Sequence, residues 1–89
     1  MENEINWDKH KKQMRDMRKG RCDLFEKKTI TELEGLGYEV RRMSPYHFRI
    51  NGRLDIYPAN KRWHDIKLID RGDIRGVTFV GFIKQYLPL

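Results

Sequence analysis

Two aspartates and a lysine in the middle of the chain have the types and spacing of a metal-dependent hydrolytic site. Asp55 precedes Asp65 by ten residues, and Asp65 forms an acid-x-lysine pair with Lys67. Clustered carboxylates are ligands that Mg²⁺ prefers, and a lysine can stabilise the charge that develops as a phosphodiester is cleaved. The chemistry that this pattern indicates is therefore that of a nuclease, provided that the two acids lie side by side.

These three residues resemble the PD-(D/E)XK nuclease signature, in which acids on adjacent strands precede an acid-x-lysine pair. Arg53-Leu54 stands where that family has a proline and an acid. As an alternative, Arg53 and Lys67 neutralise both acids as ordinary cross-strand pairs on a solvated face. We favour this alternative and expect no enzymatic activity. A nuclease that depends on a metal ion or on His47 is the third candidate function.

The positive charge of the chain is concentrated near its N-terminus. Residues 9–21 hold seven cations and one acid, so this block alone equals the net charge of +6 of the whole chain. Clustered lysine and arginine is the electrostatic footprint of a polyanion partner, although a solvated basic helix has the same composition. The candidate phosphate contacts are Lys9, Lys11, Lys12, Arg15, Arg18, Lys19 and Arg21.

Length and composition indicate one small domain. The 89 residues are 38% hydrophobic and 36% charged, against usual fractions of about 45–50% and about 25%. The core is therefore small, and no apolar run approaches the ~18 residues of a membrane span or forms a signal peptide. We expect a cytoplasmic protein without membrane association, in agreement with its single cysteine. The three histidines lack metal-ligand spacing, so neither a metal nor another cofactor is expected.

Helical periodicity dominates the first part of the chain. It predicts a basic helix over about 6–19 and a second helix over about 22–35, continuous or broken at Gly20. Three or four short strands are expected next, at Tyr38–Met43, Tyr46–Ile50, Leu54–Tyr57 and Trp63–Leu68. A charged loop at 70–73 leads to a last helix near Val77–Leu87. The predicted fold class is α+β: an antiparallel three- to four-stranded sheet with helices on one face (α-β-β-β-α), plus an extra N-terminal helix. Residues 1–21 would be this basic helix and residues 22–89 the globular unit.

Strand register can be argued from the alternation of side chains. A three-residue loop with a left-handed Gly52 is expected to pair Phe48 with Leu54 and Tyr46 with Ile56, which gives one apolar face. A second turn centred on Asn60 is expected to give these pairs: Tyr57 with Trp63, Asp55 with Asp65, and Arg53 with Lys67. The inner face would then hold Leu54, Ile56, His64, Ile66 and Leu68. The outer face would hold His47, Arg49, Arg53, Asp55, Tyr57, Trp63, Asp65 and Lys67.

Two further resemblances bear on function. The stretch LEGLGYEVRRMSPYHFRINGRLDIYP, followed by FIKQYL, resembles the plan of double-stranded-RNA-binding domains and of HicA-type mRNA-cleaving toxins over residues 30–87. In the HicA-type family a histidine on strand two is catalytic, which by position implies His47; Ser44-Pro45-Tyr46 precedes it in place of Gly-Ser. Tyr57-Pro58 followed by Arg62-Trp63 is similar to small uncharacterised bacteriophage proteins with a Y-P-x(4)-W hairpin. That similarity implies a phage origin and either nucleic-acid binding or inhibition of a host enzyme.

The function expected from these patterns is nucleic-acid binding in the host cytoplasm. Bases would stack on the aromatic residues of a second binding face, which comprises Arg49, Arg53, Tyr57, Trp63, Lys67 and Arg71. The alternative is a phage inhibitor that binds a host defence or regulatory protein. The sequence does not distinguish DNA from RNA. It also leaves open whether Trp7, Met14 and Met17 pack on the domain or form the seam of a homodimer.

Overall fold

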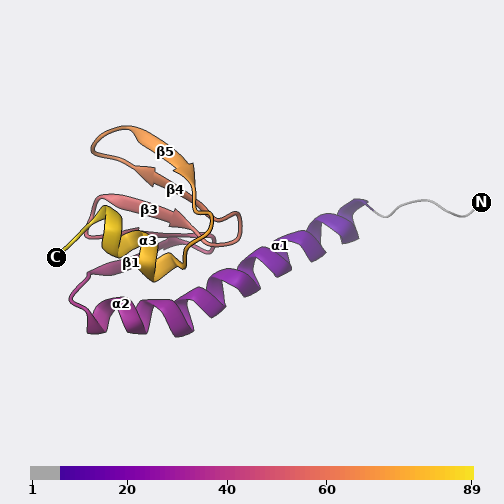
Figure 1. Cartoon of the computed structure of the whole chain (residues 1–89). Coiled ribbons are helices and arrows are strands. Elements are labelled where there is room, and N and C mark those ends of the chain that lie inside the picture. Colours follow the sequence, from indigo (N-terminus) through magenta and orange to yellow (C-terminus); the bar gives the residue numbers. More distant parts are fainter. Residues whose placement is uncertain (1–6) are drawn as a thin grey trace, which may run out of the picture.

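A continuous helical segment leads into the sheet. The computed structural model describes the backbone of residues 7–89 and the side chains of residue 11 and residues 13–89. Helix α1 (Trp7–Leu24) continues directly into the π-helical turn η1 (Phe25–Ile30) and into α2 (Thr31–Gly35). Gly20 therefore does not break the helix. The part of α1 nearest the N-terminus extends beyond the sheet (Figure 1).

The rest of the chain forms one antiparallel sheet and a final helix, so the predicted α+β class is confirmed. The five strands are β1 (Val40–Ser44), β2 (His47–Ile50), β3 (Leu54–Tyr57), β4 (Arg62–Asp65) and β5 (Asp70–Asp73). They lie in sequence order across the sheet, and helix α3 (Phe79–Tyr86) follows them. The sheet thus has five strands, where three to four were expected.

The β2–β3 hairpin has the odd turn that was expected. Three residues connect Ile50 to Leu54, and Asn51 and Gly52 have φ of 52° and 67°, in the left-handed region that glycine and asparagine tolerate best. Ile50 pairs with Leu54, and Phe48 with Ile56. The expected partners were wrong by two residues, a displacement that keeps Phe48, Leu54 and Ile56 on their predicted inner face. Tyr46, expected to pair with Ile56 on that face, instead precedes β2 and is exposed.

The β3–β4 hairpin has an even turn, where an odd one was expected. Residues 58–61 connect the two strands. The observed pairs are Leu54 with Asp65, Asp55 with His64, Ile56 with Trp63 and Tyr57 with Arg62. The expected pairs of Tyr57 with Trp63, Asp55 with Asp65 and Arg53 with Lys67 are therefore wrong. Because side chains alternate, this displacement by one residue turns each side chain of β4 to the other face.

Trp63 and Asp65 consequently face the helices, and His64 faces the open side of the sheet. All three had been expected to point the opposite way. The indole of Trp63 packs against α3, with ring centroids 5.6 Å from Phe82 and 5.0 Å from Tyr86. A residue expected to contact a ligand thus belongs to the contact between the sheet and α3.

Strand β5 forms where a loop was expected. The chain leaves β4 at Asp65 and turns through residues 66–69. The Asp65 carboxylate accepts hydrogen bonds from two backbone N–H groups of this turn, at 2.9 and 3.1 Å. Ile66 and Leu68, predicted to extend β4 and point inward, are instead 37% and 61% exposed.

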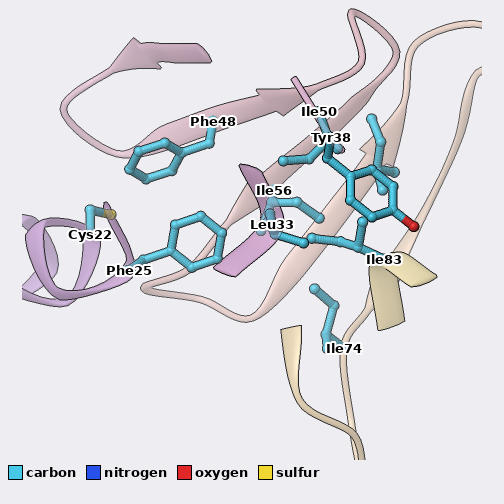
Figure 2. Packing of buried hydrophobic residues seen from close by; sticks show 10 residues of the cluster. Cys22, Phe25, Leu33, Tyr38, Phe48, Ile50, Ile56, Ile74 and Ile83 are labelled. Carbon is cyan, nitrogen blue, oxygen red and sulfur yellow. The ribbon is translucent and has the colours of Figure 1, made fainter. Parts of the chain in front are cut away.

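The core lies between the sheet and the helices (Figure 2). Its fully buried apolar side chains are Cys22, Leu33, Phe48, Ile50, Leu54, Ile56 and Ile83. Phe25 of η1 packs on Phe48 of β2 and on Phe79 of α3, with centroids 4.8 and 5.1 Å apart. Every described side chain from Lys11 to Arg21 is exposed, and Cys22 is the first buried one. The division of the chain between residues 21 and 22 into two units stays a prediction.

Candidate nucleic-acid interface

The predicted phosphate contacts of the N-terminal block lie on helix α1. Their described side chains are all exposed: Lys11, Arg15, Arg18, Lys19 and Arg21. The side chains of Lys9 and Lys12 lie outside the described residues. Because α1 projects from the sheet (Figure 1), its cations can meet a partner without displacing any part of the core.

Three of these cations form a row on one side of α1, which we call the cationic row: Lys11, Arg15 and Arg18. Positions 11, 15, 18 and 22 follow steps of four, three and four, which place them on one face of an α-helix. Cys22 is 0% exposed and marks the side that faces the domain. The cationic row therefore lies on the same face of α1 as Cys22, which packs against the sheet domain.

The turn next to the end of the cationic row adds further positive charge. The guanidinium of Arg21 donates a hydrogen bond to the carbonyl of Ala59 in the β3–β4 turn, at 3.1 Å. Lys61 of the same turn is exposed, and so is Arg62, the first residue of β4, which lies 3.6 Å from Asp73. Helix α1 and this turn thus form one basic surface built from two elements far apart in sequence.

Cations on α1 differ in how they are neutralised. Lys19 lies 3.3 Å from Asp23, and both side chains are about half exposed, so this surface pair contributes ~0–1 kcal/mol. Among the described side chains, no carboxylate forms a salt bridge with the cationic row. The described part of the chain therefore leaves the positive charge of the cationic row uncompensated.

The open face of the sheet carries a row of polar residues across all five strands. Neighbouring strands align Arg41, Arg49, Asp55, His64 and Arg71 in that order. Arg49 holds the Asp55 carboxylate with two hydrogen bonds of 2.7 and 3.1 Å, the two-pronged geometry of strong arginine–carboxylate pairs. This bond raises the pKa of Arg49 above its ordinary value. Arg49 is thus neutralised within the fold.

One stacked aromatic pair lies on the open face. The rings of His47 and Tyr57 are 5.0 Å apart and inclined by 19°. His47 is fixed from both sides: its Nδ1 lies 3.2 Å from the Ser44 hydroxyl, and its Nε2 lies 3.7 Å from Asp55. Burial raises the pKa of the Tyr57 hydroxyl. Of the two aromatics expected on this face, only Tyr57 is there.

The acids of the nuclease hypothesis are separated by the sheet. Asp55 lies on the open face and Asp65 on the helix face, so the expectation that they are neighbours is wrong. Asp65 is fully buried and accepts hydrogen bonds from Arg53 at 2.8 Å and from the Tyr86 hydroxyl at 2.6 Å. The Arg53 bond holds the pKa of Asp65 well below its usual range. Within residues whose side chains are described, no cluster of His, Cys, Asp and Glu could hold a metal ion.

The remaining predicted contacts are dispersed. Arg53 lies in the β2–β3 turn with its guanidinium on Asp65, and exposed Lys67 lies in the β4–β5 turn. Arg71 lies on β5, on the open face beside His64. Met14 and Met17 of α1 are 39% and 55% exposed, so neither is buried against the domain. The side chain of Trp7 lies outside the described residues, and self-association through α1 stays a prediction.

Sequence reasoning missed a hollow on the open face. About 650 Å³ of space lies between β3 and β5, lined by Tyr57, Asn60, Arg62, Trp63, His64, Arg71, Gly72 and Asp73. Residues 70–73, which line one side of the hollow, were expected to form a loop and not a strand. The odd turn expected at Asn60 placed His64 on the helix face and not on the open face. A four-residue turn through residues 58–61 would have predicted His64 on the open face, next to Tyr57, and so indicated the hollow.

Comparisons with known proteins add no family to this description. No protein-family model, curated protein or solved structure matches the chain. The similarity to bacteriophage proteins stays a prediction. Among the described residues, no helix combines the length and apolarity needed to cross a membrane.

Proposed function

We propose that the protein binds nucleic acid, with the cationic row of α1 as its main phosphate contact. The observation that carries this proposal is the exposure of Lys11, Arg15 and Arg18 on one helix face, without a described carboxylate partner. A cationic surface that its own fold does not neutralise attracts a polyanion, and phosphate contacts supply most non-specific affinity.

The shape of α1 supports the same partner. Its 18 residues span about 27 Å, and an α-helix with side chains is about 10–12 Å wide, close to the ~12 Å width of the DNA major groove. Lys61 of the β3–β4 turn would contact a phosphate that flanks the helix. Binding of this kind reads no sequence by itself, because phosphate contacts position a protein and base contacts specify it.

Salt dependence tests the proposal directly. Fluorescence anisotropy would measure the affinity of the protein for labelled 20-nucleotide DNA and RNA, single-stranded and duplex, at several salt concentrations. Each phosphate neutralised on duplex DNA contributes about 0.9 to the slope of log affinity against log salt. Replacing all three residues of the cationic row by glutamine should therefore lower the slope by about 2–3 and weaken binding at low salt.

A matched control removes the same charge elsewhere. Lys27, Lys28 and Lys84 are exposed cations on η1 and α3, and their triple replacement by glutamine should leave the slope nearly unchanged. Absence of binding to every oligonucleotide at low salt refutes the proposal. Equal losses in the two triple variants would show that only net charge matters and that α1 is not the binding surface.

A second candidate function is that of a phage inhibitor acting on a protein in the host cytoplasm. It is supported by the β4–β5 turn, where Leu68 and Ile69 are 61% and 84% exposed, since exposed apolar clusters mark protein contacts. A nuclease-treated bacterial lysate would be passed over wild-type protein and over a Leu68→Ser/Ile69→Asn variant. The inhibitor proposal expects one stoichiometric partner retained by the wild type alone; equal retention by both proteins would count against it.

A further inference from the structure

The hollow on the open face combines features of a small-molecule site. Its volume of about 650 Å³ falls within the ~300–1,000 Å³ typical of such sites. Tyr57 contributes an aromatic ring on one side, and Arg71 contributes a guanidinium from β5 on the other. Asn60 and His64 add groups that can donate or accept hydrogen bonds.

Arg71 differs from Arg62, the other arginine that lines the hollow, because no described carboxylate neutralises it. Arg62 lies 3.6 Å from Asp73, and Arg75 shares that carboxylate at 3.0 Å. The side chain of Arg71 is exposed, and among the described residues it forms no salt bridge; only its backbone N–H bonds to Asp70, at 2.9 Å. An anion at Arg71 would therefore not have to displace a carboxylate.

Tyr57 is prepared for stacking. Its ring is already held nearly parallel to His47 at a centroid distance of 5.0 Å, and the side chain is half-buried. A ring fixed in advance loses little conformational entropy when a second ring stacks against it. Aromatic stacking of this kind accepts any base, because every base has a π-face.

We propose that this hollow binds one unpaired nucleotide, with its base against Tyr57 and its phosphate at Arg71. The inference rests on the proposed function, because the nucleotide is taken to belong to the strand that α1 holds; a free nucleoside monophosphate presents the same chemistry. The simultaneous presence of a ring and an uncompensated guanidinium distinguishes a nucleotide from inorganic phosphate, which would use only Arg71.

NMR titration of the ¹⁵N-labelled full chain is the first test. Adenosine monophosphate, adenosine and inorganic phosphate would be added separately at millimolar concentration. The monophosphate should shift the amide signals of Tyr57, His64 and Arg71 saturably, and each of the other two ligands should bind about ten-fold more weakly or not at all. If the monophosphate causes no saturable shift in these strands, or binds no better than phosphate, the inference is wrong.

Substitutions separate the two halves of the site. Arg71→Gln and Tyr57→Leu should each weaken the monophosphate about ten-fold, the size expected for a lost charged hydrogen bond or a lost stack. Lys84→Gln removes an exposed cation from α3 and should change nothing. Arg71 is exposed, so Arg71→Gln keeps the test valid even if Tyr57→Leu impairs folding. Unchanged affinity in Arg71→Gln overturns the assignment.

Oligonucleotides distinguish this inference from the function on which it rests. Tyr57→Leu should weaken a five-nucleotide single strand several-fold more than a duplex, whereas loss of the cationic row should weaken both and leave the free monophosphate unaffected. Equal effects of Tyr57→Leu on single strand and duplex refute the unpaired nucleotide. Duplex binding without any monophosphate binding refutes the proposal for the hollow and supports the proposed function of α1. Monophosphate binding without polymer binding supports the hollow and refutes the proposed function of α1.

Discussion

Replacing Gly72 by alanine should destabilise the protein, because Trp63 fills the space where a side chain would go. Gly72 pairs with Trp63 across β4 and β5. A Cβ atom at position 72 would lie 2.8 Å from the indole Nε1 and 3.0 Å from Cε2. The indole cannot withdraw, since Phe82 and Tyr86 pack against it from α3. Overpacking of this kind costs typically about 1–3 kcal/mol of unfolding free energy, and we expect about 2 kcal/mol.

Urea unfolding followed by circular dichroism would measure this loss, together with a fall in Tm of roughly 10 °C for a domain of this size. Gly20→Ala is the matched control, because nothing lies within 4 Å of a Cβ at that helical position. Alanine is favoured over glycine inside a helix by about 1 kcal/mol, so the same chemical change should increase stability or helicity there. A Gly72→Ala variant as stable as the wild type would show that Trp63 does not face the helices and that the register of β4 is wrong.

Two further predictions concern the end of the sheet away from α1. Asp65→Asn should lower stability at neutral pH, since Arg53 and Tyr86 lose a charged partner. Because the folded-state pKa of Asp65 is depressed, the contribution of this carboxylate to the free energy of unfolding is full above the ordinary carboxyl pKa of 3.8. That contribution is lost as the pH falls below this value. Unfolding curves of the two proteins should therefore converge in acid, and a constant difference would contradict this. Ile69→Asn should raise the unfolding free energy by about 1 kcal/mol, because Ile69 has a φ of 54°, a left-handed conformation that costs roughly 1–2 kcal/mol for most residues. Leu68→Asn, at a neighbouring exposed position, should show no such gain in the same measurement.

Hydrophobic patterning predicted much of the fold. The helical periodicity of residues 22–35, the Asn51-Gly52 turn and the apolar face of the last helix each indicated an element that the structure contains. These signals are local: each lies within one element or one turn. They were enough for the α+β class and for the side on which Phe48, Leu54 and Ile56 are buried.

The fourth and fifth strands depended on contacts that are not local. Residues 70–73 contain no apolar side chain, and they form a strand because β4 offers an edge and because Gly72 leaves room for the Trp63 ring. The burial of Asp65 likewise requires Arg53 and Tyr86, which are brought to it from elsewhere in the chain. A carboxylate that is compensated in this way has no signature in the sequence around it.

Turn length also decides which arginines remain available to a ligand. Arg49, Arg53 and Arg71 were equivalent candidates in the sequence, yet the fold uses the first two to hold Asp55 and Asp65. Removing either would leave a buried carboxylate without its arginine, and the resulting loss of stability would mimic a loss of binding. Arg71 forms no salt bridge with any described carboxylate. A difference in affinity at Arg71 would therefore report on the ligand, whereas the same substitution at Arg49 or Arg53 would report mainly on the fold.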